Sequence, residues 1–294
     1  MPLLTVYTPT YNRAYILHEC YESLLRQTNQ NFKWLIVDDG STDQTNELVN
    51  IWIKEGKIDI NYIYQENQGV HVARNKAIEN IDTYLNVCID SDDHLPDNAV
   101  ELITKLWTEK GGEQYAGIIG WDVYKSGKVV GKKFPESLEV ATLMDLYEVY
   151  NIPGDKKPVY RTDIAKLFPS PQFEGENYFP NRYKYSLTDE VAPCLLLHEP
   201  LCIVEYLPDG ITANLFTRYL KNPRGFIFYR EFLMKKSNSL YKRLRQAIHL
   251  NAMQLHIKNN GYIKKSEYPI TVAFALPLGW ILLNYIKYKA KKKG

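Results

Sequence analysis

Cysteine is scarce in this chain, and no excess of one charge runs through it. The 294 residues include four cysteines, none in a Cys-x-x-Cys pair, and no secretory signal opens the sequence. We therefore expect reduced thiols in a cytosolic protein. Lysine and arginine total 36, against 34 aspartates and glutamates. Internal repeats and low-complexity segments are also missing. The sequence has no basic stripe with interleaved aromatic side chains, which argues against a nucleic-acid-binding protein.

What the sequence does contain is a cluster of carboxylates, Asp90-Ser91-Asp92-Asp93, directly after the apolar run 84–89. Three carboxylates in four positions repel one another, and a divalent cation would relieve that repulsion. Oxygen ligands at the end of a strand suit Mg²⁺ or Mn²⁺, which usually also hold substrate phosphates. The alternative is a solvated acidic turn, because serine and aspartate are common in turns.

Two further strands are predicted to end in polar turns. Residues 32–37 lead into Asp38-Asp39-Gly40, and residues 3–8 lead into the segment 9–13. Helical patterns lie between the strands, which is the layout of an α/β sheet. Ligands of such sheets bind outside the carboxyl ends of the strands. We therefore expect all three turns to face the same crevice.

The end of the chain combines an uncharged apolar run, residues 268–286, with a cluster of lysines. Pro277 and Gly279 argue against one uninterrupted spanning helix. An apolar segment followed by a polybasic end is typical of proteins that lie on an anionic membrane surface. The alternative is a C-terminal helix packed on the protein's own core. The lysines of the cluster are Lys287, Lys289, Lys291, Lys292 and Lys293.

Five segments within residues 1–100 form a recognisable set: 6–13, 23–28, 37–43, 67–75 and 90–93. In this order and spacing they resemble the motifs of family 2 glycosyltransferases. The resemblance implies the GT-A fold, a Rossmann-like mixed α/β sheet flanked by helices. It also implies a metal-dependent, inverting transfer of a sugar from a nucleotide-sugar donor, with Mn²⁺ or Mg²⁺ as the cofactor.

The resemblance assigns roles to residues at the ends of the first two strands. It places Pro9, Tyr11 and Arg13 along the nucleotide pocket. Asp39 matches the carboxylate that accepts a hydrogen bond from the uracil ring, and such a contact discriminates between bases. Asp38, which precedes it, is expected to orient the turn.

The carboxylate cluster and the segment before it are assigned in the same way. Asp90 matches the residue that approaches the ribose, and Asp92 matches the ligand of the metal on the diphosphate. Asp93 is an alternative metal ligand, because the tandem pair leaves the register open. His71 and Arg74 are candidate contacts to the nucleotide, since a helix N-terminus binds anions. The alternative is that the segment simply begins a helix with its apolar side facing inward.

The acceptor hydroxyl must lose its proton to a base, usually a carboxylate within reach. In many relatives this base is an Asp preceded by Glu, and no such pair stands at the expected place here. Glu176 takes that position in a variant run of the family, and Asn181 stands where an acid often occurs. Glu174, Asp189 and Glu190 are the competing candidates. Asp122 is a further carboxylate that fits a sugar or acceptor site.

We predict a GT-A domain over residues 1–215, a helical extension over 216–265 and an apolar, polybasic tail over 266–294. The predicted function is transfer from a UDP-sugar to a saccharide acceptor in polysaccharide or cell-envelope synthesis. The tail favours a lipid-linked saccharide as acceptor and a peripheral position on the cytoplasmic membrane face. Two rivals stay open: a metal-dependent nucleotidyltransferase, which needs a second carboxylate cluster, and a nucleotide-sugar-binding scaffold without a base.

Overall fold

The computed structural model describes residues 2–205 and 215–292, which divide into two compact units. Unit 1 comprises residues 1–170 and 181–205, and unit 2 comprises residues 171–180 and 206–294. The predicted boundary at residue 215 therefore falls inside unit 2. The predicted extension and tail share this one unit, and residues 171–180 join them. Each unit is described by itself.

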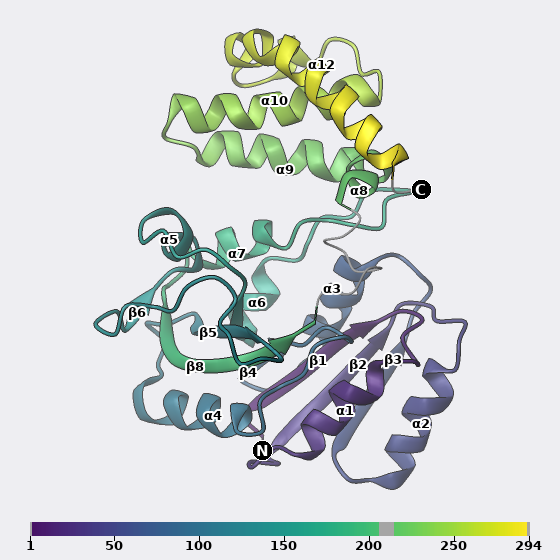
Figure 1. The fold of residues 1–294 in the computed structure, drawn as a ribbon, viewed down its shortest axis with the longest axis vertical. Coiled ribbons are helices and arrows are strands. Elements are labelled where there is room, and N and C mark those ends of the chain that lie inside the picture. Colours follow the sequence, from purple (N-terminus) through teal and green to yellow (C-terminus); the bar gives the residue numbers. More distant parts are fainter. Residues whose placement is uncertain (1, 206–214, 293–294) are drawn as a thin grey trace. The chain divides into compact units, whose positions relative to one another are not determined.

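Unit 1 is built on a mixed sheet with the strand order β3-β2-β1-β4-β7-β5-β8-β6 (Figure 1). Its first half is parallel and consists of β1 (Leu4–Thr10), β2 (Phe32–Asp38), β3 (Asp59–Tyr64) and β4 (Leu85–Cys88). Most residues of strands β1 and β2 are apolar or β-branched, and β1 is buried throughout. Such runs are typical of parallel strands that are covered on both faces. The carboxyl ends of β1, β2 and β4 therefore lie at the same edge of the sheet.

The second half of the sheet is mixed, and its strand β7 begins at that edge. Strand β7 (Lys156–Arg161) runs antiparallel to β4 and to β5 (Gly117–Tyr124). Strand β8 (Cys194–Val204) runs parallel to β5, and the short β6 (Val140–Ala141) pairs with β8. Because β7 is antiparallel, its first residues lie beside the end of β4, at the edge where the predicted carboxylate turn begins.

Helices cover the sheet on both faces, with one apolar core cluster on each side. Trp34 of β2 is fully buried in the first cluster. The predicted mixed α/β sheet flanked by helices is thus confirmed. The helices are α1 (Leu17–Leu25), α2 (Thr45–Glu55), α3 (Val70–Asn80), α4 (Ala99–Lys110), α5 (Leu143–Glu148), α6 (Thr162–Leu167) and α7 (Arg182–Thr188).

Residues 215–292 of unit 2 are mostly helical, with α12 packed against α10. Asn251 of α10 donates a hydrogen bond to the Val272 carbonyl of α12 at 2.8 Å, and a Cβ at Gly279 would lie 2.4 Å from the Cβ of Asn251. The predicted interruption at Pro277 is wrong, because α12 continues through it. Tertiary packing outweighs the single hydrogen bond that a proline removes. The helices are α8 (Leu215–Lys221), α9 (Pro223–Lys236), α10 (Leu240–His256), α11 (Tyr262–Lys265) and α12 (Pro269–Lys291).

Candidate active site

The turns after β1 and β2 are fastened to each other by Asn12. Its backbone has a φ of 52°, a conformation that asparagine tolerates better than most residues. The Asn12 side-chain oxygen accepts the backbone N–H of Thr42 at 2.7 Å and of Asp43 at 3.3 Å. The backbone N–H of Asn12 donates to the Ser41 hydroxyl. The two turns therefore form one rigid rim at the carboxyl edge of the sheet.

The three residues predicted to line the nucleotide pocket begin on this rim. Pro9 is buried within β1. Tyr11 follows the strand and is 47% exposed, and an exposed tyrosine can stack on a planar ligand. Arg13 hydrogen-bonds the Tyr15 hydroxyl, and its guanidinium lies 5.7 Å from the centre of that ring.

Asp38 orients the turn after β2, as expected. One carboxylate oxygen accepts the Ser41 N–H at 2.8 Å, and the other accepts the Tyr62 hydroxyl at 2.6 Å. The turn also needs glycine at position 40, where φ is 84° and a Cβ would lie 2.8 Å from the Asn67 nitrogen. This packing brings the segment that begins at Asn67 against the aspartate pair.

Asp39 is held by that incoming segment. Among the described residues its carboxylate has three donors: Gln65 Nε2 at 2.7 Å and the N–H of Gln68 at 2.9 Å on Oδ1, and the N–H of Gly69 at 2.7 Å on Oδ2. Its exposed fraction is 3%. Burial raises the pKa of Asp39 above its usual value, although the hydrogen bonds lower it. A carboxylate offers about four acceptor positions, so Oδ2 has room for one further donor.

The segment 67–75 begins α3, as its alternative interpretation stated. Arg74 lies in this helix and forms an ion pair with Asp90, with 2.6 Å between the guanidinium nitrogen and Oδ1. His71 is 1% exposed and lies on the inward side of this helix. The structure makes Arg74 a partner of the carboxylate turn, and a nucleotide contact by His71 stays a prediction.

The turn of residues 90–93 is closed by the backbone N–H of Asp93, which donates to the Asp90 carbonyl at 2.9 Å. Burial favours the neutral form of Asp90, but the charges of Arg74 and Lys157 outweigh it and hold the pKa of Asp90 below its usual value. Asp92 is half-buried, whereas Asp93 is buried. Burial raises the pKa of Asp93 to about 7, even with Lys157 beside it.

Lys157 is a site residue that the sequence analysis missed. Its ammonium lies 3.7 Å from Asp93 Oδ2 and 3.4 Å from the Cys88 carbonyl oxygen. The buried carboxylate of Asp122 on β5 also acts on it, and burial raises the pKa of Asp122 to about 6. The lysine reaches the turn only because β7 is antiparallel to β4. No local pattern in the sequence announces that pairing.

The carboxylates of this turn fit a divalent cation that a substrate helps to hold. Their oxygens are the hard ligands that Mg²⁺ and Mn²⁺ prefer. Within residues 2–205 and 215–292, no group of three His, Cys, Asp or Glu side chains is arranged to bind a metal alone. One or two carboxylates completed by phosphate oxygens and water are the usual arrangement for Mg²⁺. The same finding leaves the two-metal nucleotidyltransferase rival without support in the described residues.

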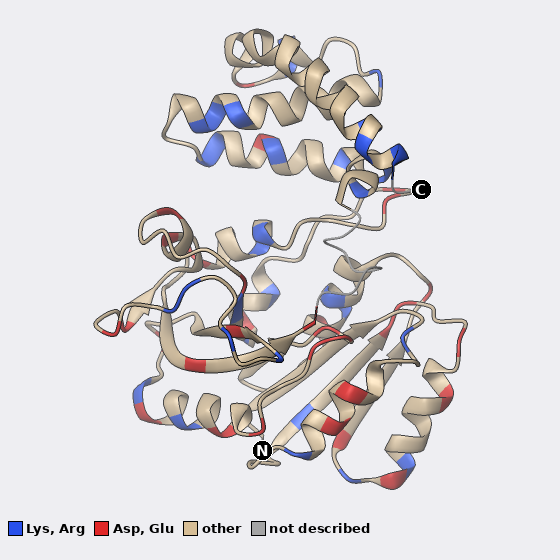
Figure 2. Cartoon of the chain, in the orientation of Figure 1, with Lys and Arg blue, Asp and Glu red and all other residues tan. Residues whose placement is uncertain are grey.

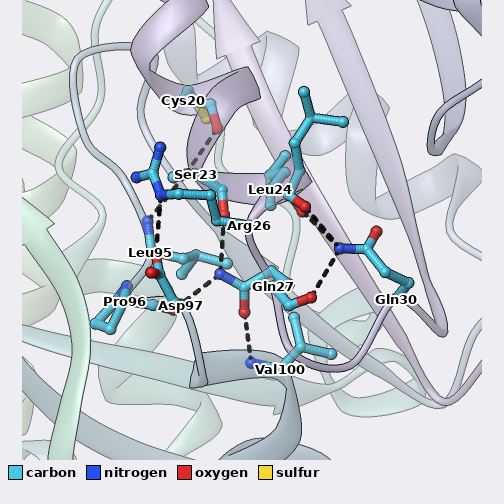
Figure 3. Close-up of polar contacts among 11 residues, drawn as sticks. Cys20, Ser23, Leu24, Arg26, Gln27, Gln30, Leu95, Pro96, Asp97 and Val100 are labelled. Atoms are coloured by element: carbon cyan, nitrogen blue, oxygen red, sulfur yellow. Dashed lines mark hydrogen bonds and ion pairs between the residues drawn. The ribbon is translucent and has the colours of Figure 1, made fainter.

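The segment 23–28 positions the chain that follows the carboxylate turn (Figure 3). The Ser23 hydroxyl accepts the Leu95 N–H at 3.3 Å. The Gln27 amide donates to the Pro96 carbonyl at 2.8 Å and accepts the Val100 N–H at 3.0 Å. Val100 lies in the first turn of α4, where backbone N–H groups lack partners within the helix. Gln27 thereby joins α1 to the beginning of α4.

Two of the carboxylates predicted as the catalytic base, Asp189 and Glu190, belong to unit 1. Asp189 accepts the N–H groups of Leu143 and Met144 at 3.2 and 2.8 Å, so it fixes the first turn of α5. It and the exposed Glu190 lead into the start of β8, which pairs with the start of β5. That end of β5 is opposite the edge where the carboxylate turn lies. The role of these two residues as the base stays a prediction.

Glu176, the leading candidate for the base, belongs to unit 2. Its two oxygens accept the N–H groups of Arg224 and Gly225 at 2.7 and 2.8 Å, at the beginning of α9. These N–H groups have no acceptor within the helix, so Glu176 stabilises the helix N-terminus. The structure thus gives this residue a capping contact.

Comparisons with known proteins show the family of this chain. The family model of glycosyl transferase family 2 matches residues 5–159. Glycosyltransferase GlyA of Streptococcus pneumoniae is 28% identical over 207 residues, which are 64% of this chain and 29% of that protein. The teichoic acid poly(glycerol phosphate) polymerase of Staphylococcus epidermidis is 34% identical over 113 residues, 38% of this chain and 16% of that protein. The chain therefore spans less than a third of either relative.

Solved structures show the same fold over the whole chain. Residues 1–349 of S. aureus TarS, in complex with UDP-GlcNAc, match with a TM-score of 0.58 at 18% identity, covering 100% of this chain and 89% of that one. The mannosyltransferase PcManGT of Pyrobaculum calidifontis, in complex with GDP-Man and Mn²⁺, has a TM-score of 0.53 at 15% identity and covers 99% and 84%. At these identities the likeness shows the fold alone, which is the expected GT-A fold.

Proposed function

Because this chain belongs to glycosyl transferase family 2, we propose that it transfers a sugar from a UDP-sugar bound at the carboxyl ends of β1, β2 and β4. The observation that supports this proposal is the hydrogen-bonding state of Asp39. Its buried carboxylate already accepts three donors and has room for one more. A nucleotide base that donates one N–H toward it satisfies the carboxylate fully.

The single acceptor position left on the Asp39 carboxylate favours uracil over cytosine and guanine. Uracil offers a single ring N–H between two carbonyl groups, whereas cytosine presents an acceptor at that ring position. Guanine presents two adjacent donors and needs two acceptor positions. A site whose buried polar group is left unpaired by the wrong ligand discriminates strongly, by about 10⁴-fold or more in favourable cases. The exposed Tyr11 ring supplies a stacking surface beside the same turn.

The carboxylate turn is proposed to hold the donor's diphosphate through Mn²⁺ or Mg²⁺. Asp92 is the proposed metal ligand, and Asp90, oriented by Arg74, is proposed to approach the ribose. A bound divalent cation supplies Lewis-acid stabilisation of the departing diphosphate. The contribution of the chain is to keep these carboxylates ionised and oriented. The charges of Arg74 and Lys157 do this for Asp90 by lowering its pKa.

Transfer is proposed to proceed by a single displacement with inversion. The acceptor hydroxyl oxygen forms a bond to the anomeric carbon while the bond from that carbon to the diphosphate oxygen breaks. The hydroxyl proton passes to a carboxylate base, for which we retain Glu176. Glu176→Gln should then lower kcat by at least 100-fold, since general-base catalysis contributes 10²–10⁴-fold. The matched variant Glu174→Gln should stay near wild type. Equal activity of Glu176→Gln and wild type would leave Glu176 with its capping contact only.

The acceptor is proposed to be a lipid-linked saccharide, with α12 lying on an anionic membrane. By length and composition alone, α12 is the one candidate span among the described residues, and most of its apolar window is solvent-exposed. Ile270, Phe274 and Trp280 are 84%, 73% and 61% exposed, and lysines gather at the end of the helix (Figure 2). Its other side is buried against unit 2 through Val272 and Leu283. A helix packed on one side and apolar on the other fits an interfacial position rather than a span.

The donor proposal is tested by calorimetric titration of UDP and GDP, each with and without Mn²⁺. Wild type should bind UDP more tightly than GDP, and Mn²⁺ should strengthen UDP binding. Asp92→Asn should lose the Mn²⁺ effect, whereas the control Asp97→Asn, in an exposed ion pair with Arg26, should retain it. Equal binding of both nucleotides, or binding of neither, would contradict the proposed donor.

The membrane proposal is tested by flotation with vesicles that contain anionic lipid and with neutral vesicles. Phe274→Ser combined with Trp280→Ser should reduce flotation with anionic vesicles by at least fivefold. Leu240→Ser, which removes an exposed apolar side chain from α10, is the matched control. High salt should weaken wild-type binding, because exposed charges are screened. Unchanged flotation of the double variant would refute the α12 surface as the contact.

A further inference from the structure

Beyond its effect on the pKa of Asp90, Lys157 has no role in the proposed transfer, yet it is buried among carboxylates of the 90–93 turn and of β5. It faces Asp93 at 3.7 Å, and the charges of Asp90 and Asp122 also act on it. A buried ammonium is costly unless carboxylates surround it, and buried carboxylates are equally costly without a cation. The buried lysine and the buried carboxylates therefore stabilise one another.

Asp93 is correspondingly bound into the protein. Besides Lys157, the Cys202 thiol of β8 donates to its Oδ2, with a sulfur–oxygen distance of 3.6 Å. Its backbone N–H closes the turn onto Asp90, so both ends of the residue are fixed. A carboxylate that a lysine and a thiol hold inside the protein cannot turn outward to a metal without weakening the compensation of that lysine's buried charge.

We propose that Lys157 is a positioning residue that commits Asp93 to the protein interior, so that Asp93 sets the shape of the turn and Asp92 alone of this pair contacts the metal. The inference rests on the proposed metal-dependent donor site and settles which member of the tandem pair is the ligand. Lys157 acts through the turn and does not touch the substrate.

Lys156 provides a matched control because it precedes Lys157 in β7 and is equally buried. Its ammonium donates to the carbonyl oxygens of Pro153 and Gly154, at 3.1 and 3.0 Å. Replacing either lysine by methionine removes one buried cation from the same strand. Only Lys157→Met removes the partner of Asp93.

The first experiment measures thermal stability in EDTA without nucleotide, in a double-mutant cycle. Lys157→Met and Asp93→Asn should each lower Tm by about 10 °C, because breaking a buried pair leaves one charge uncompensated. The double variant should regain at least half of that loss. Full recovery is not expected, since Asp122 remains buried. Lys156→Met with Asp93→Asn should be additive. Additive losses for Lys157→Met with Asp93→Asn would overturn the proposed pair.

The second experiment measures how strongly Mn²⁺ increases UDP affinity. Lys157→Met should reduce this increase at least tenfold, and Lys157→Arg should restore it. Lys156→Met should keep the wild-type increase even where it lowers Tm. The Lys157→Met/Asp93→Asn variant should bind within threefold of wild type. A loss as large as that of Asp92→Asn would show that Asp93 is a metal ligand and overturn the proposal.

The two experiments separate failure of this inference from failure of the proposed function. Absence of UDP binding by wild type would end the donor assignment, while the stability cycle would still decide whether Lys157 and Asp93 act as a pair.

Discussion

Gln27→Leu is the most direct test of how the carboxylate turn is supported. Leucine has a similar volume but cannot hydrogen-bond, so the substitution removes the bonds of Gln27 to Ser23 O, Pro96 O and Val100 N. The Pro96 carbonyl still accepts the N–H of Ala99 at 3.0 Å. The main cost is therefore the buried N–H of Val100, which is left without its acceptor.

The size of the effect follows from this count. A buried donor without an acceptor costs about 1–3 kcal/mol, and a lost hydrogen bond costs about 1 kcal/mol. We expect Gln27→Leu to lower the free energy of unfolding by about 3 kcal/mol, which corresponds to about 9 °C in Tm for a unit of this size. The start of α4 should also loosen, so the Mn²⁺ dependence of UDP binding should weaken several-fold.

Gln30→Leu is the matched control, three residues further along. The Gln30 amide donates to the carbonyls of Leu24, Leu25 and Gln27, at the end of α1 and just beyond it (Figure 3). Because it is exposed, water can replace these bonds, and we expect a loss below about 1 kcal/mol. Urea unfolding and calorimetric UDP titration measure both effects. Equal losses for the two variants, or wild-type behaviour of Gln27→Leu, would refute the cross-link between α1 and α4.

Three further predictions concern the rest of the molecule. Asp39→Asn should weaken UDP binding at least tenfold in titration, since an amide places a donor against the donors that now hold the carboxylate. Gly279→Val should destabilise unit 2 by about 1–3 kcal/mol in urea, because a Cβ there meets Asn251 at 2.4 Å. Burial lowers the pKa of His249 to about 3, so the unfolded state binds the extra proton below pH 6.5 and stability should fall as pH drops toward 3. His249→Phe should flatten the Tm profile between pH 7 and pH 5.

The parallel half of unit 1 was predictable because its signals are local. The runs that form β1, β2 and β4 are short, mostly apolar and followed at once by polar turns. Strand patterns and turn residues can be recognised from residues that are close in the sequence. The mutual placement of the Asp38–Asp39 and 90–93 turns then followed from the rule that ligands bind at the carboxyl ends of parallel strands.

The remainder depends on contacts between distant residues. Lys157 reaches Asp93 through an antiparallel pairing of β7 that no short window of sequence encodes. Helical spacing alone could not tell that His71 faces inward and Arg74 faces Asp90. Asp189 illustrates a third limit, since a carboxylate beside a helix serves equally well as a cap or as a base until its neighbours are known.

The two apolar sides of α12 have a practical consequence for handling this protein. Removing the helix to improve yield would uncover the buried face of α10 that Val272 and Ala275 now cover. A shortened chain would then expose the apolar face of α10 in place of that of α12. Aggregation of such a fragment would not test whether α12 binds lipid. Serine replacements confined to the outward stripe of Ile270, Phe274 and Ile281 keep the helical unit intact and are the better route to crystals and to clean kinetics.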